Sequence, residues 1–196
     1  MTLRQTVLKI IYPLWIYYNK LTGIRSKVLK NKTKIDPPQS FYTLAAQLND
    51  GKELSFDSLK GKKVLLVNTA SDCGYTNQYH DLQKLFEEKK DQLTIIGFPA
   101  NDFKQQEKGS DSEIAEFCQT NFGVGFPLAK KSSVTRGPQQ NPVFKWLTDK
   151  TKNGWTNKQP SWNFSKWLVD EQGMLTHYFD PAISPLGEEV ASAVNS

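Results

Sequence analysis

The sequence is poor in cysteine and histidine. It contains two cysteines, Cys73 and Cys118, and two histidines, His80 and His177, in 196 residues. Two cysteines exclude a small domain held together by several disulfides, and two histidines leave no cluster with the spacing of a metal site. We therefore expect no metal and no cofactor, so any chemistry of the cysteines is thiol chemistry.

Acidic residues are absent from the first 34 residues, which hold eight lysine and arginine side chains. The whole chain has a formal net charge of +5, so the rest of the chain carries −3. Beyond residue 35 there is no basic stripe interleaved with aromatic residues, the pattern that nucleic-acid binding favours. We therefore expect a basic N-terminal extension, a mildly acidic domain and no nucleic-acid partner.

A long hydrophobic run is also missing. Residues 7–18 are apolar except for Lys9, but Pro13 interrupts them and they fall short of the ~20 residues that cross a membrane. Their aromatic residues and the basic residues 20–34 are typical of a helix lying on an anionic membrane surface. A helix that packs on its own domain or on a partner fits the same pattern.

These observations predict a two-part organisation. Residues 1–38 form the extension, which ends at Asp36-Pro37-Pro38, and residues 39–196 form one globular domain. We expect the protein to be cytoplasmic, with residues 1–34 contacting a membrane surface if the first interpretation of the extension holds.

The domain has the pattern of an α/β protein. Residues 64–67 and 93–98 are typical of buried strands, and residues 77–90 between them repeat apolar side chains at helical spacing. A strand, helix, strand order predicts parallel strands with a right-handed crossover. Turn and capping signals predict a hairpin of 41–47 with 53–56, a hairpin of 164–169 with 174–179, and helices that begin at Ser110, at Asn141 and near Pro185.

Cys73 follows the first buried strand and precedes the helix. A small, polar turn, Ser71-Asp72-Cys73-Gly74, occupies this position. The free amide groups and the positive end of a helix dipole stabilise a thiolate, which is the nucleophilic form of cysteine. Lone cysteines are more often inert core residues, but the polar turn favours a reactive thiol.

Three segments resemble, in order and spacing, the motifs of the glutathione peroxidases, a family with a thioredoxin fold. Residues 67–76 (VNTASDCGYT) resemble the peroxidatic segment, with cysteine where some animal members have selenocysteine. Residues 97–107 (GFPANDFKQQE) resemble the glutamine loop, and residues 162–170 (WNFSKWLVD) resemble the Trp-Asn-Phe segment. The resemblance covers roughly residues 40–190. It implies a thioredoxin-like α/β fold, with a central mixed sheet flanked by helices and an N-terminal β-hairpin.

The resemblance also assigns roles. It implies that Cys73 is the peroxidatic thiol and that Gln106, Trp162 and Asn163 are the catalytic polar groups around it. A thiolate that attacks an O–O bond becomes a sulfenic acid, so the site needs donors for the sulfur and for the leaving oxygen. Amide and indole N–H groups are neutral donors of this kind. Without the other motifs, Trp162 would be interpreted as a core residue and Asn163 as a turn residue.

Two positions depart from the family's pattern. Asp72 stands where members often have a basic residue, and a neighbouring carboxylate raises a thiol pKa unless it points away. Ala100 stands where many non-selenium members have a cysteine. The second thiol is then Cys118, and Phe117-Cys118-Gln119 resembles the resolving-cysteine helix of thioredoxin-dependent members. Since a disulfide needs Cα atoms within about 7 Å, we expect that helix to unwind locally.

The resemblance implies a thiol peroxidase that reduces hydrogen peroxide or organic hydroperoxides and is recycled by thioredoxin or glutathione. The short connection between Trp146 and Trp162 is typical of monomeric members that accept bulky lipid hydroperoxides. Two other classes of function stay open at this point. One is a redox sensor that passes its oxidation to a partner, and the other is a thioredoxin-like binding module without turnover.

Overall fold

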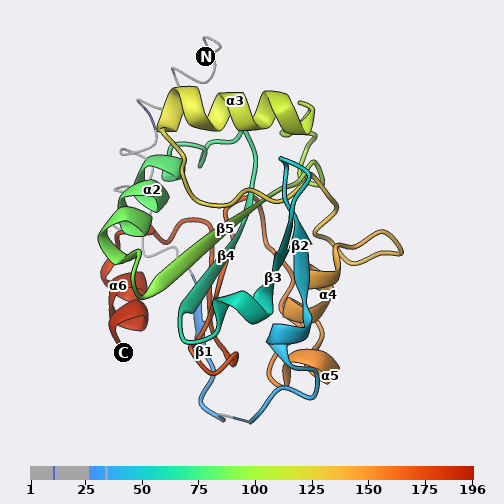
Figure 1. The fold of residues 1–196 in the computed structure, drawn as a ribbon, viewed down its shortest axis with the longest axis vertical. Coiled ribbons are helices and arrows are strands. Elements are labelled where there is room, and N and C mark those ends of the chain that lie inside the picture. Colours follow the sequence, from blue (N-terminus) through green and yellow to red (C-terminus); the bar gives the residue numbers. More distant parts are fainter. Residues whose placement is uncertain (1–10, 12–26, 34) are drawn as a thin grey trace.

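A five-stranded mixed sheet runs through the centre of the protein (Figure 1). The structure is a computed structural model that describes residue 11, residues 27–33 and residues 35–196. The strands β4 and β5 are parallel, and the other neighbouring pairs are antiparallel. In spatial order the strands are β1 (Val28–Lys30), β7 (Leu175–Phe179), β6 (Lys166–Val169), β4 (Lys63–Thr69) and β5 (Leu93–Pro99).

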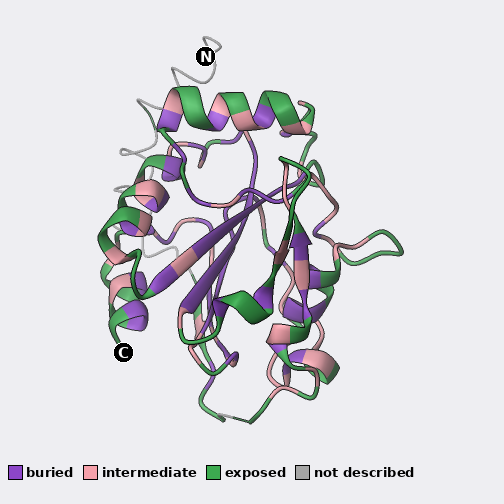
Figure 2. Ribbon diagram, viewed as in Figure 1, coloured by how far each residue is buried: buried purple, intermediate pink, exposed green. Residues whose placement is uncertain are grey.

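The sheet separates two hydrophobic cores. Side chains of β4 alternate between them, with Leu65 and Val67 in one core and Val64 and Leu66 in the other. The first core also receives residues of α2 (Gln78–Lys89), α3 (Asp111–Phe122) and α6 (Glu188–Asn195). The second receives residues of α4 (Pro142–Leu147) and of a small two-stranded sheet, β2 (Ala45–Gln47) with β3 (Glu53–Ser55). Figure 2 shows the buried sheet between helices with exposed outer faces.

The expected α/β class is confirmed, as are its main local signals. The helix α2 connects the parallel strands β4 and β5, and β2 pairs with β3 as the N-terminal hairpin. At the start of α3, the side chains of Ser110 and Glu113 form a capping box, each accepting a main-chain N–H of the other residue. Asn141 caps α4 in front of Pro142. Local patterns therefore located most elements correctly.

Two strand boundaries were predicted wrongly. The expected strand 41–47 begins with a 3-10 helix, η1 (Phe41–Thr43), because the Ser40 hydroxyl accepts the Tyr42 N–H and turns the chain. The expected strand 164–169 begins at Lys166, since Phe164 adopts a φ of 67° that no strand can contain. The short helices η2 (Phe56–Leu59) and α5 (Lys150–Asn153) were not predicted.

The described part of the N-terminal extension contributes β1, which the sequence pattern did not reveal. This strand pairs antiparallel with β7 at the edge of the main sheet. Apart from Ile11, the apolar segment 7–18 lies outside the described residues. Within the described part of the chain, no helix is both long enough and apolar enough to cross a membrane.

Candidate active site

Cys73 lies in the turn between the end of β4 and the start of α2, as predicted. The side chain of Thr76 shapes this turn, because its hydroxyl accepts the Cys73 N–H (3.0 Å) and donates to the Ala70 carbonyl (2.8 Å). The Tyr75 N–H points at the Cys73 sulfur, at 3.5 Å. Only 2% of Cys73 is exposed. The thiol is therefore buried beneath the surface of the turn, with a main-chain donor already directed at it.

The turn that carries Trp162 and Asn163 is bound to the end of β4. Asn68, within β4, donates its side-chain N–H to the Trp162 carbonyl (3.1 Å) and accepts the Phe164 N–H with its main-chain oxygen (2.6 Å). The Asn68 N–H also donates to the Ser165 carbonyl (3.3 Å). Because Cys73 follows the same strand, these bonds set the turn of Trp162 and Asn163 beside the thiol.

Phe164 gives this turn its shape. A φ near +67° is costly for a bulky residue, by roughly 1–2 kcal/mol, so the surroundings must hold it. The ring is fully buried and packs edge-on against Tyr79, with centroids 5.4 Å apart. The Lys166 ammonium donates to the Phe164 carbonyl at 2.8 Å. Packing and hydrogen bonds together fix the direction of the preceding Asn163.

The loop after β5 brings Gln106 to the same place. The Gln106 carbonyl accepts the Asp72 N–H at 3.0 Å, and the Gln106 side-chain oxygen accepts an N–H of Asn163 at 3.0 Å. The loop bends sharply just before this point, since Lys104 and Gln105 both have positive φ (51° and 52°). The bond to Asn163 uses the oxygen of Gln106, so its amide nitrogen keeps two N–H groups for another acceptor.

The environment of the Cys73 thiol contains opposing effects. Burial raises the pKa of Cys73, and the charge of Asp72 adds to this rise. Hydrogen bonds from the Tyr75 N–H and from the Trp162 and Asn163 side chains act in the opposite direction, and the net pKa is above its usual value. Burial is the largest of these effects, and the sequence alone did not reveal it. Trp162 and Asn163 are among the residues that the resemblance named, Tyr75 is not, and Gln106 is connected through Asn163.

An aromatic and basic rim, formed by Phe103 and Lys104, lies against Trp162, and sequence reasoning missed it. The Phe103 ring lies 5.4 Å from that of Trp162, and the Lys104 ammonium lies 5.8 Å from the Trp162 ring centre. Tyr75 and Trp162 are partly buried and pack on the core that contains Cys73. Phe103 follows Asp102 in the glutamine loop, so its position in that motif was the available signal. The rim combines two aromatic rings with one positive charge.

Cys118 lies in α3 and is completely buried in the same core as Cys73. Both cysteines are free thiols. Burial raises the pKa of Cys118 to about 12, and the charge of Glu107 adds to the rise while the Tyr79 hydroxyl opposes it. Its carbonyl accepts the Val124 N–H (3.3 Å) at the end of the helix. Cys118 is thus a protonated core residue in this conformation.

Glu107 is a buried carboxyl group between the two thiol-bearing segments. It is 1% exposed, and its Oε2 accepts the Ser71 hydroxyl at 3.1 Å. Its N–H donates to the Asn101 side chain at 2.9 Å. Burial raises the pKa of Glu107 to about 7, although Ser71 and Lys131 act against the rise. The sequence placed Glu107 in the glutamine loop but gave no sign of this burial.

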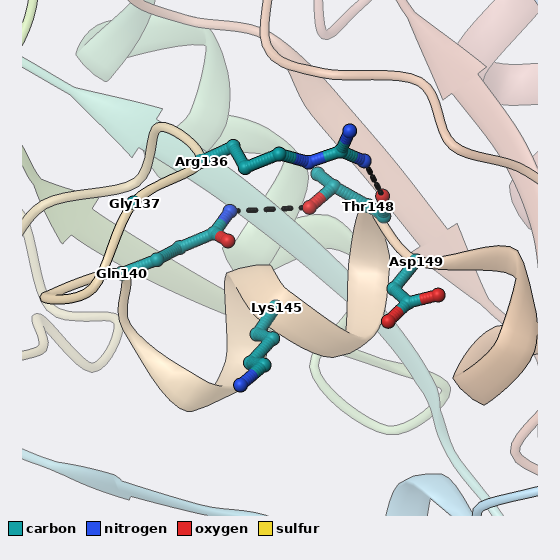
Figure 3. Close-up of a pocket in the computed structure, with 6 residues that line it drawn as sticks. All are labelled: Arg136, Gly137, Gln140, Lys145, Thr148 and Asp149. Carbon is teal, nitrogen blue, oxygen red and sulfur yellow. Dashed lines mark hydrogen bonds between the residues drawn. The ribbon is translucent and has the colours of Figure 1, made fainter.

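A cavity of about 310 Å³ lies elsewhere, beside α4 (Figure 3). The Arg136 guanidinium and the Gln140 amide both bond to Thr148 there, at 3.3 Å and 3.1 Å. Its lining residues are Arg136, Gly137, Gln140, Lys145, Thr148 and Asp149, and none of them is a predicted site residue. Among the described residues, no three His, Cys, Asp or Glu side chains gather into a group that could hold a metal ion. The thiol turn therefore remains the candidate site.

Comparison with known proteins agrees with this geometry. Residues 41–148 match the family described as glutathione peroxidase. The glutathione peroxidase-like peroxiredoxin HYR1 of Saccharomyces cerevisiae is 46% identical over 146 residues, which are 74% of this chain and 89% of that protein. The glutathione peroxidase homolog BsaA of Staphylococcus epidermidis is 43% identical over 148 residues, 75% of this chain and 92% of that protein.

Solved structures show the same relationship and identify the fold. The crystal structure of T. cruzi GPX1 superposes with a TM-score of 0.59 at 28% identity, covering 79% of this chain and 93% of that one. A thioredoxin family thiol:disulfide interchange protein from Chlorobium tepidum superposes with a TM-score of 0.55 at 15% identity, covering 84% of this chain and 99% of that one. The expected thioredoxin-like fold is confirmed.

Proposed function

Because this chain belongs to the glutathione peroxidase family and is a thiol peroxidase, we propose that Cys73 attacks the peroxide and that Cys118 resolves the product. The observation that supports this most directly is the convergence of Tyr75, Trp162 and Asn163 on one buried sulfur. Segments far apart in the sequence supply these donors, and none of the donors carries a charge. Such donors stabilise developing negative charge without binding the thiolate in an ion pair.

In the first step the Cys73 thiolate attacks one peroxide oxygen. The S–O bond forms as the O–O bond breaks, which gives a sulfenic acid and releases an alkoxide or hydroxide that takes up a proton. The sulfur is oxidised by two electrons and the peroxide is reduced to an alcohol or water. The indole N–H of Trp162 and the amide N–H groups of Asn163 and Gln106 are the donors that can stabilise the leaving oxygen.

In the second step the Cys118 sulfur attacks the sulfenic acid sulfur, which forms the disulfide and releases water. Cys118 must first leave its buried position in α3. Only Ile114, Cys118 and Phe122 of this helix are buried, and its remaining residues are partly or fully exposed. Partial unwinding of α3 therefore costs less than opening the central sheet, whose strand β4 is buried along its whole length.

We propose thioredoxin as the reductant of this disulfide, by thiol exchange. The aromatic and basic rim of Phe103, Lys104 and Trp162 favours organic hydroperoxides with a large apolar part, lipid hydroperoxides included. We further propose that the protein acts as a monomer in the cytoplasm. A redox sensor or a binding module without turnover would consume at most one equivalent of peroxide per protein molecule.

An NADPH-coupled peroxidase assay tests this function. It is run on the same protein with thioredoxin and thioredoxin reductase, and in parallel with glutathione and glutathione reductase. We expect continuous NADPH consumption with thioredoxin and a much slower rate with glutathione. Faster turnover with glutathione would reject the reductant, and no turnover with either would reject the thiol peroxidase cycle itself.

The N-terminal extension is proposed to contact membranes. Residues 1–26 contain four of the eight basic residues and the apolar segment 7–18, whereas residues 28–30 form a strand of the folded domain. The full-length protein should co-sediment with vesicles that contain anionic lipid, and a variant lacking residues 1–26 should not. Equal sedimentation of both proteins would contradict this assignment, and neutral vesicles serve as the control for charge.

A further inference from the structure

The N-terminal segment is bound to the sheet by more than the pairing of β1 with β7. The Asn31 N–H donates to the Thr176 carbonyl (2.8 Å), and the Asn31 side chain donates to the Leu175 carbonyl (3.0 Å). Leu29 packs against the second hydrophobic core. This segment lies outside residues 41–148, which match the family. It forms the edge strand of the main sheet, beside β7.

The same segment also binds the residue that follows β7. The Lys27 N–H donates to the Asp180 carboxylate at 2.7 Å, and the Asp180 N–H donates to the Lys27 carbonyl at 3.0 Å. Both contacts use the main chain of Lys27. They depend on where the N-terminal backbone lies and not on the identity of its side chain.

The other oxygen of Asp180 reaches the turn that carries the catalytic donors. It accepts the Tyr178 hydroxyl at 2.7 Å and the Ser161 hydroxyl at 3.0 Å. The Ser165 hydroxyl in turn accepts the Ser161 N–H (3.1 Å) and donates to the Trp162 carbonyl (2.9 Å). Hydrogen bonds thus run without interruption from the start of β1, through one carboxylate, to the catalytic turn.

We propose that residues 27–31 are a positioning element of the peroxidatic site, holding through Asp180 the 161–165 turn that presents two donors to Cys73. When β1 leaves the edge, one carboxylate oxygen loses its main-chain donor. The carboxylate then turns towards water or towards Lys158, whose Nζ lies 4.0 Å from it. The turn gains freedom, and the sulfur loses part of its hydrogen bonding.

Two proline substitutions in the full-length protein isolate the contribution of β1. The bonds made by Lys27 and Asn31 show that alternate residues direct their main-chain groups at β7, so Leu29 does the same. Leu29→Pro removes a donor of the ladder. Val28→Pro removes an N–H that points away from β7, which an edge strand tolerates. It is the matched control, because it also removes an apolar side chain from the same strand.

The measurement is the rate at which iodoacetamide alkylates Cys73 over a series of pH values, followed on the Cys73 peptide by mass spectrometry. Loss of donors to the thiolate moves the midpoint of this profile to higher pH. For Leu29→Pro we expect the alkylation rate of Cys73 at neutral pH to be roughly three- to tenfold lower than in the wild type. The reason is that raising the thiol pKa by one lowers the thiolate fraction about tenfold. Val28→Pro should follow the wild-type profile. Alkylation needs no turnover, so this test is independent of the proposed peroxidase cycle.

Amide hydrogen exchange at Tyr178 and Asp180 verifies that Leu29→Pro releases β1. Release with an unchanged alkylation profile would overturn the proposal. Adding Asp180→Asn to Leu29→Pro should change the alkylation profile no further, because both substitutions break the same connection between β1 and the 161–165 turn. Additive shifts of the profile would also overturn the proposal. If Leu29→Pro does not fold, Asn31→Ala decides the question: a shift in the same direction supports the proposal and an unchanged profile overturns it.

Discussion

Cys73 and Cys118 are both buried in one hydrophobic core, but their surroundings prepare them for different tasks. Cys73 lies in a turn between secondary-structure elements, where a main-chain N–H and two side chains donate to its sulfur. Cys118 lies within a helix, near the Tyr79 hydroxyl and the Glu107 carboxyl group, and has a pKa of about 12. One thiol has its donors in place, whereas the other requires a change of conformation before it can react.

Under the proposed cycle, this difference separates two ways in which a thiol is prepared for reaction. The donors around Cys73 are held by fixed structure, including the positive φ of Phe164 and the bonds of Asn68. The reactivity of Cys118 depends instead on how easily α3 opens. Its N-terminus is strongly capped by Ser110 and Glu113, while its C-terminus ends at Gly123 in the left-handed region (φ 63°). Its C-terminal cap binds the Cys118 carbonyl directly, because the N–H groups of Gly123 and Val124 both donate to it.

The largest expected effect comes from Cys73→Ser, which should reduce peroxide consumption with thioredoxin to the level of the blank. A hydroxyl is a far weaker nucleophile than a thiolate at neutral pH. Because the two side chains have nearly the same size, the thermal unfolding temperature should stay close to that of the wild type. Substantial peroxidase activity in this variant would contradict the assignment of Cys73.

Cys118→Ser should separate the two thiols. The variant should consume one equivalent of peroxide and then stall with thioredoxin, while excess peroxide carries Cys73 to the sulfinic acid. Intact-mass measurement distinguishes this from wild-type protein, which should lose two hydrogens as the disulfide forms. Normal turnover of Cys118→Ser would show that the second cysteine is only a core residue and that Cys73 works without it.

The donors are tested with Trp162→Phe, Asn163→Ala and Gln106→Ala. Each should lower the second-order rate of sulfenic acid formation, by roughly a hundred- to thousandfold where the lost donor faces the developing charge. The decrease should be smallest for Gln106→Ala if this side chain acts mainly through Asn163. Trp155→Phe, in the other core, is the matched control for the loss of an indole. Unchanged rates in all three variants would make these residues structural.

The smallest expected effect concerns Glu107 and depends on pH. Below 4.5, its ordinary pKa, the carboxyl group is neutral in the folded and the unfolded protein. Between 4.5 and about 7 the folded protein keeps a proton that the unfolded chain has lost, so its stability falls as pH rises. Glu107→Gln should therefore be more stable than the wild type above pH 7, and this advantage should shrink towards pH 4.5.

Urea denaturation at several pH values measures this effect, and Glu113→Gln is the control of opposite sign. Hydrogen bonds from Ser110 hold the pKa of Glu113 below its usual value. Its contribution to stability is therefore present above pH 4.5 and is lost as the pH falls. If both variants showed the same pH dependence, the opposite pKa shifts of Glu107 and Glu113 would be contradicted.

Much of the candidate site could be predicted, because its motifs are local. The apolar run before Cys73, the helical spacing after it and the capping signal at Ser110 depend on neighbouring residues. The resemblance then assigned Trp162 and Asn163, which the structure brings to the sulfur. The sequence left the pKa of Cys73 open between the helix start and Asp72, and burial, which depends on every segment packed around the turn, raises it.

The sequence by itself determined the order of the longer strands and helices, the position of Cys73 between a strand and a helix, and the family to which the chain belongs. These follow from periodicity, capping and motif spacing, which operate over a few residues. Only the tertiary structure decided that Glu107 is buried, that Phe103 and Lys104 lie against Trp162, and that β1 joins the sheet. The physical reason is that burial and strand pairing are set by partners distant in sequence, such as Asp180 for Lys27.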